Sequence, residues 1–171
     1  MKSFDDDPEV RSIVLQDDGT YPNNPRPLLL FLRAVCPNPA DIERLFTTNH
    51  WPSAWRNGVY PYHHYHSTAH EALGAYDGSA TILFGGPGGT TVTIRAGDVA
   101  VIPAGVAHRC LEASRDFRIV GAYPLGQRWD MCYGQAGERP AADQNIAAVP
   151  DPQMDPVQGE TGALPRLWQL S

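Results

Sequence analysis

The chain has 171 residues, 42% of them hydrophobic, and a formal net charge of −6. This length suffices for one domain with a buried core, and the few, scattered Lys and Arg residues exclude the basic surface that nucleic acids or anionic membranes require. The 16 Gly and 16 Pro residues favour many turns and short strands over long helices.

The compartment is predicted from what the sequence lacks. Residues Met1–Asp7 are acidic and contain no apolar signal segment, and the apolar run Leu28–Val35 is too short to cross a bilayer. The cysteines, Cys36, Cys110 and Cys132, are odd in number and too far apart for a CxxC motif. We therefore expect a soluble, cytoplasmic protein.

The N-terminal part of the chain predicts a short strand at Ser12–Leu15, a second strand and one helix. Leu28–Leu32 is apolar without alternation, which indicates a strand that is buried on both faces or covered by a partner subunit. Asn38 followed by Pro39 is typical of a helix start, and the helix is expected to end near Asn49. We expect this to be the only substantial helix.

From Gly58 onward the sequence predicts short strands separated by strong turns. Asp77-Gly78 indicates a hairpin between two of them. The expected strands are 71–76, 79–84, 91–94, 99–102, 108–112 and 117–123. Strands this short and closely spaced predict a sandwich or barrel. Residues 135–171 look largely irregular, and we expect this tail to pack on the barrel within a single domain of residues 1–171.

Histidines cluster near the start of this strand-rich region. Four of the six histidines lie close together there: His63, His64, His66 and His70. On an extended strand His64 and His66 project from the same face, roughly 7 Å apart, so both rings can reach one cation at metal–nitrogen distances of about 2.1 Å. A histidine-rich surface strand is the plainer alternative.

Two spaced motifs set this cluster in context. The first, within 58–78, has the form Gly58, five residues, His64-Tyr65-His66, four residues, Glu71, six residues, Gly78. The second, within 97–112, has the form Gly97, five residues, Pro103, one residue, Gly105, two residues, His108, with Glu112 where asparagine is usual. The chain therefore resembles the cupin superfamily, and its flanking segments, 55–58 and 121–124, are similar to those of small single-domain bacterial cupins of unassigned function.

The resemblance implies an all-β fold, a cupin-type antiparallel β-barrel (double-stranded β-helix or jelly roll), here with one short N-terminal helix. It also implies that His64, His66, Glu71 and His108 bind one divalent transition metal, Fe, Mn, Ni or Zn. Strand alternation alone would instead place His70 on the face of His64 and His66. For Glu71 to be a ligand, the strand must be interrupted near 67–69, and His70 then lines the pocket or supports a ligand.

The four ligands that the resemblance implies predict metal-dependent conversion of a small organic molecule in the barrel. Fe(II)-type dioxygenase chemistry is expected ahead of isomerase or epimerase chemistry. The alternative is a non-catalytic protein that binds a sugar or metabolite through the metal. No catalytic residue can be assigned from the sequence. Candidates to line the pocket are His70, Tyr62, Cys110 and Arg118. We expect a small-molecule ligand, no nucleic-acid or membrane partner, and a homodimer, which an exposed run at Leu28–Leu32 and the long tail would favour.

Overall fold

The computed structural model describes residues 7–169, so residues 1–6 and 170–171 of the expected domain lie outside the described residues. Its strands are β1 Glu9–Leu15, β2 Asn24–Leu32, β3 Ser53–Asn57, β4 Glu71–Asp77, β5 Ser79–Phe84, β6 Thr90–Arg95, β7 Val99–Ile102, β8 His108–Ala113 and β9 Arg118–Ala122. Its helices are α1 Pro39–Thr48, α2 Ala141–Ala148 and α3 Ala163–Leu167. No helix within 7–169 combines the length and apolar character needed to cross a bilayer.

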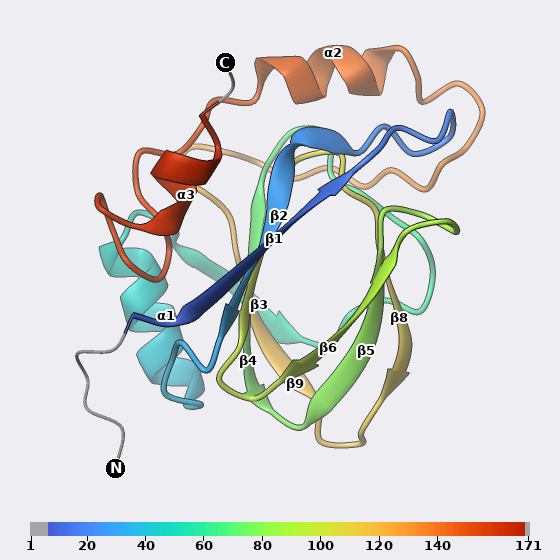
Figure 1. The fold of residues 1–171 in the computed structure, drawn as a ribbon. Helices are drawn as coiled ribbons and strands as arrows, with labels where there is room; N and C mark the ends of the chain where they lie inside the picture. Colours follow the sequence, from blue (N-terminus) through green and yellow to red (C-terminus); the bar gives the residue numbers. More distant parts are fainter. Residues whose placement is uncertain (1–6, 170–171) are drawn as a thin grey trace.

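Two antiparallel sheets face each other around a common core (Figure 1). The larger sheet has the order β1-β2-β7-β4-β9-β3, and the smaller has the order β6-β5-β8. Side chains from both sheets fill the space between them, including Leu30, Leu73, Ile82 and Ile102. The all-β, cupin-type barrel predicted from the sequence is confirmed.

The turn at Asp77-Gly78 connects the two sheets rather than two paired strands. β4 pairs with β7 and β9, whereas β5 pairs with β6 and β8, so the predicted hairpin is wrong. Gly78 has a φ of 65°, and a Cβ there would lie 2.7 Å from the backbone nitrogen of Phe117. Glycine is needed at this barrel corner because both the left-handed backbone and the close approach exclude a side chain.

β2 is buried on both faces, as its unbroken apolar run predicts. Leu28 and Leu30 belong to the core inside the barrel, whereas Leu29 and Phe31 pack in a second core outside it. That second core includes Phe46 of α1 and residues of the C-terminal tail. The run is therefore covered by its own chain, and the expectation that it is exposed for a partner subunit is wrong.

α1 begins where the sequence predicts. The side chain of Asn38 accepts a hydrogen bond from the backbone N–H of Asp41 at 3.1 Å, and Pro39 occupies the first turn. The helix lies against β4 at Gly74, where a Cβ would be only 2.6 Å from a side-chain carbon of Ile42. This close contact fixes the outer face of the strand that begins with Glu71.

The C-terminal tail packs on the barrel but is not irregular throughout. It contains α2 and α3, so α1 is not the only helix of the described chain (Figure 1). These helices are short, and α2 is rich in alanine with few large apolar residues, so neither shows a clear apolar periodicity. Trp168 fixes the end of the tail: its buried indole donates a hydrogen bond to the carbonyl of Pro27 at 2.9 Å.

Candidate metal centre

The segment before β4 does not form a continuous strand. His64 makes a single bridge to His108, with hydrogen bonds between the two backbones in both directions, at 3.3 and 2.9 Å. Residues 67–70 are outside any strand, and β4 begins at Glu71. The interruption that the spacing requires is therefore present, and it separates the side-chain alternation of β4 from that of His64 and His66.

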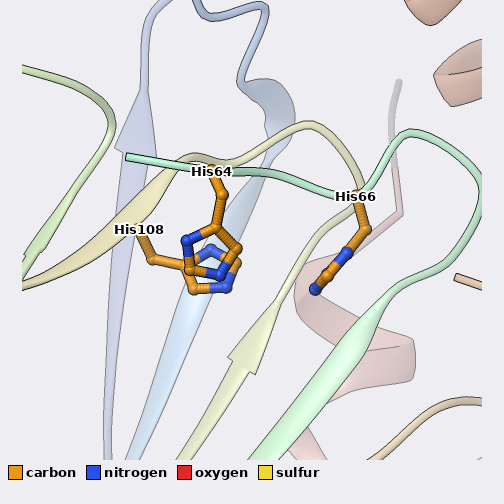
Figure 2. Close-up of side chains that lie close together, drawn as sticks. All are labelled: His64, His66 and His108. Atoms are coloured by element: carbon orange, nitrogen blue, oxygen red, sulfur yellow. The ribbon is translucent and has the colours of Figure 1, made fainter. Parts of the chain in front are cut away.

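Three buried imidazoles gather at one end of the barrel (Figure 2). One donor atom from each of His64, His66 and His108 lies within 4.8 Å of the other two. The ring centroids of His64 and His108 are 4.1 Å apart, and those of His66 and His108 are 5.6 Å apart. Three nitrogen donors this close form a group that one ion could bridge.

Each of these histidines is oriented by its own main-chain partner. The Nδ1 atoms of His64, His66 and His108 lie 3.0, 2.6 and 3.1 Å from the carbonyl oxygens of Tyr62, Asp130 and Val106, respectively. A carbonyl can only accept, so Nδ1 carries the proton and the neutral ring keeps a lone pair on Nε2. Histidines that ligate metals are oriented in this way.

Glu71 faces the same group from the first position of β4. Its Oε2 lies 3.2 Å from Nε2 of His66, and its Oε1 lies 3.2 Å from Nε2 of His108. Tyr123 donates a hydrogen bond from its hydroxyl to Oε2 at 2.8 Å. With Nδ1 protonated, the rings turn Nε2 lone pairs toward a carboxylate, and either a bound cation or a proton on one Nε2 would satisfy this group of acceptors.

The ionisation states of these groups follow from burial and from one another. Burial would raise the pKa of Glu71, but His66 and His108 hold it below its ordinary value. Burial and His108 lower the pKa of His64 to about 3. Burial also opposes protonation of His66, but the Glu71 carboxylate outweighs it and raises the His66 pKa. An ionised carboxylate beside imidazole lone pairs is a donor set that fits a divalent transition metal.

His70 lies on the other side of the barrel wall. Its Nδ1 accepts a hydrogen bond from the backbone N–H of Ala104 at 2.9 Å, and its ring centroid is 4.7 Å from that of Trp168. His70 is therefore buried between the sheet and the tail, and the expectation that it lines the pocket is corrected. The physical reason is that Glu71, the first residue of β4, points inward, so the residue just before the strand points to the opposite face.

A cavity of about 240 Å³ opens beside the histidines and Glu71. Its other lining residues are mostly aromatic or apolar: Trp55, Asn57, Gly58, Val59, Tyr60, Leu73, Tyr123, Trp129 and Met131. Cys110 and Arg118 line a different hollow, so their proposed place in this cavity is corrected. Tyr62 is exposed and stacks on Tyr60 with 5.0 Å between centroids, which places it beside the cavity rather than in its lining.

Asp130 is a supporting residue that the sequence motifs do not reveal. Its carbonyl lies 2.6 Å from Nδ1 of His66, and its side chain accepts hydrogen bonds from both the backbone and the hydroxyl of Ser67. It therefore fixes a histidine and the bend that follows it. The sequence motifs likewise do not reveal Tyr123 and Trp129, because both residues lie beyond the two motifs and no spacing rule connects them to the histidine group. Glu112 is exposed, so its carboxylate adds no charge to the site.

The chain was compared with family models, solved structures and curated proteins. No protein-family model matches the chain. A DUF861 family protein from Thermotoga maritima is 22% identical, with a TM-score of 0.35, over 51% of this chain and 92% of that one. HEPD from Streptomyces albus, with the substrate 2-hydroxyethylphosphonate and Fe(II) bound, is 13% identical, with a TM-score of 0.31, over 84% of this chain and 25% of that one.

The uncharacterised protein YjlB of Bacillus subtilis is 40% identical over 161 residues, which cover 94% of this chain and 97% of YjlB. Similarity at this level over nearly the whole of both chains shows that the two proteins share a common ancestor. The chain belongs to the YjlB family.

Proposed function

We propose that the protein binds one divalent transition metal through His64, His66, His108 and Glu71, and acts on a small organic molecule in the adjoining cavity. The observation that carries the proposal is the pair of Nε2 atoms, of His66 and His108, that each lie 3.2 Å from an oxygen of Glu71, with His64 in the same buried group. Neutral rings and a carboxylate packed together are buried acceptors, and a bound divalent ion would satisfy them. Fe(II)-dependent dioxygenase chemistry is the first candidate activity.

The surrounding residues prepare the site for such chemistry. A bound Fe(II) would supply redox chemistry toward dioxygen, and any divalent ion would supply a Lewis acid. Main-chain carbonyls orient the three imidazoles, and Tyr123 holds one oxygen of Glu71. The apolar lining limits access of water to the reacting molecule.

The choice between reaction types rests on the groups left over once the metal ligands are assigned. Among the described lining residues, the remaining titratable side chains are Tyr60 and Tyr123. Burial and the Glu71 carboxylate raise the pKa of Tyr123 well above its ordinary value, so it stays protonated and is no base. Isomerisation by proton abstraction needs a base, and Tyr60 is the one titratable side chain of the described lining left for that role, which favours the oxygenase. Non-catalytic binding of a metabolite or sugar is the second candidate, because it needs no acid or base.

Metal content tests the proposal directly. Protein purified anaerobically without an affinity tag or chelator should contain close to one transition-metal ion per chain by mass spectrometry. Iron would support the oxygenase and justify assays of oxygen uptake, whereas zinc, nickel or manganese would favour the other candidates. The His64→Ala and His108→Ala variants should lose the ion while keeping the fold by circular dichroism. Metal retained by both variants would refute the site.

A further inference from the structure

Aromatic rings stand directly beside the metal-binding group. Trp129 and Tyr123 are stacked, with centroids 6.0 Å apart and planes inclined by 23°. Their centroids lie 5.8 and 5.9 Å, respectively, from that of His66, and the Tyr60 centroid lies 5.4 Å from that of His64. A ligand bound at the metal would therefore lie close to these aromatic rings. Aromatic rings attract one another when their centroids are roughly 4.5–7 Å apart.

The polar atoms in the deep part of the cavity are already occupied. The indole N–H of Trp55 donates to the hydroxyl of Tyr123 at 2.9 Å, and that hydroxyl donates to Glu71 at 2.8 Å. The Nδ1 atoms of the histidines are bonded to main-chain carbonyls. The inner wall thus offers a ligand ring faces and edges, and the other polar side chains of the lining, those of Asn57, Tyr60 and Trp129, belong to exposed residues. A polyol such as a sugar requires donors and acceptors around its whole surface.

The charge of the site limits the ligand further. No Lys or Arg is present among the described residues that line the cavity, so an anionic group away from the metal would find no cationic side chain. A divalent ion together with the Glu71 carboxylate leaves a single positive charge. A chelating group with one negative charge neutralises it, whereas a phosphate ester or dicarboxylate would leave buried charge unpaired.

We propose, on the basis of the metal site inferred above, that the cavity binds a planar, single-ring aromatic molecule carrying a bidentate oxygen chelating group of charge −1. The volume of about 240 Å³ suits one ring, since it lies just below the range of roughly 300–1,000 Å³ common for ligand pockets. Tyr60 and Trp129 are each 48% exposed at the mouth. Contact with an incoming ring explains why two large aromatic side chains are left open to solvent there.

The test compares two chelators that differ only in the ring. Protein loaded with Co(II) is titrated with benzohydroxamate and with acetohydroxamate, and binding is followed through the visible absorption of the ion. The chelating group is the same in both, so the ratio of the two affinities measures the contribution of the ring. We expect benzohydroxamate to bind about 10- to 100-fold more tightly, as burial of a ring against aromatic side chains predicts.

Matched variants locate the effect. Trp129→Ala should reduce the affinity ratio toward unity without changing the Co(II) content, and Val59→Phe, which fills the cavity, should do the same by exclusion. Leu125→Ala is the control, because Leu125 is 69% exposed on the same loop and does not line the cavity. Stoichiometric Co(II) with equal affinities, or with no hydroxamate binding, would overturn the ligand class and leave the metal site intact. Failure to bind Co(II) would overturn both.

Discussion

Histidines 64, 66 and 108 each use one ring nitrogen to bond the main chain and keep the other for the cavity. This arrangement needs no charged partner for the ring, because a carbonyl two residues away or on a neighbouring loop provides the acceptor. The rings are thereby held in one tautomer before any ion arrives. Such preorganisation reduces the cost of ordering the ligands when the metal binds.

The roles of two neighbouring residues, Glu71 and His70, can be separated by substitution. Glu71→Gln removes the charge next to His66 and His108 and should weaken metal binding by more than the roughly 10- to 100-fold typical of supporting residues. His70→Asn retains an acceptor for the backbone N–H of Ala104 and should leave affinity unchanged, because His70 faces the tail. Metal affinities from competition with a chelator check this pair. A greater loss in the His70 variant would contradict the placement of Glu71.

Tyr123 should affect the metal through Glu71. Tyr123→Phe removes the hydrogen bond to Glu71 and leaves the indole N–H of Trp55 without its acceptor. We expect metal affinity to fall about 10- to 100-fold while the fold is retained. Tyr62→Phe is the control, since that exposed hydroxyl is not part of the network. Equal affinities in the two variants would show that Glu71 does not depend on Tyr123.

At the scale of elements, the close pairing of β3 and β9 supports the cavity wall. Trp55 lies opposite Gly121, and a Cβ at Gly121 would be 2.2 Å from the indole ring. Gly121→Ala should therefore displace Trp55 and cost about 1–3 kcal/mol of unfolding free energy. Urea unfolding measures the loss, and Gly88→Ala, whose Cβ would meet no atom within 4 Å, should have little effect. Equal stability of the two variants would exclude the close packing.

The elements also show which parts of the site a sequence can predict. The spacing of the two motifs identifies His64, His66, Glu71 and His108, which the structure brings together. Strand alternation alone misleads before β4, because residues 67–70 interrupt the pattern. Alternation correctly places Cys110 on the inward side of β8, where it packs against the interior core. Alternation does not predict that Cys110 lies away from the cavity, beside a different hollow.

The cavity wall is harder to predict than the ligands. Trp55 comes from β3, Tyr123 follows β9, and Trp129 and Asp130 lie in the loop beyond it. Each contributes because strands distant in sequence become neighbours in the larger sheet, and no local periodicity records that pairing. α2 and α3 are missed for another reason: the tertiary packing of their short apolar faces, rather than propensity, stabilises them.

At the scale of the whole molecule, the tail makes stability depend on pH through His70. Burial lowers the pKa of His70 to about 4 from an ordinary 6.5. Below pH 6.5 the unfolded chain takes up a proton that the folded chain refuses until about pH 4, so stability falls as pH decreases through that window. The loss approaches about 3 kcal/mol. Urea unfolding at pH 7.5 and pH 5 should show a smaller difference for His70→Asn than for the natural chain, and equal differences would refute the assignment.

The oligomeric state stays a prediction. Because β2 is covered by its own chain, the expectation of a homodimer now rests on the long tail alone. A mass in solution near twice the 18.7 kDa of one chain would support it, and light scattering during size-exclusion chromatography measures this. A single-chain mass at all concentrations would exclude the dimer. The proposed ligand set and the cavity lie within one chain and do not depend on the outcome.

The reciprocal backbone bonds between His64 and His108 have a consequence for exchange kinetics. Each of these amide hydrogens is held by the carbonyl of the other residue, so neither can exchange with solvent unless the two segments separate. That separation also moves apart two of the proposed metal ligands. Bound metal should therefore slow deuterium uptake at both amides by the same factor, and removal of the ion should accelerate both together. The rate at which a chelator extracts the metal would then report the opening of this end of the barrel.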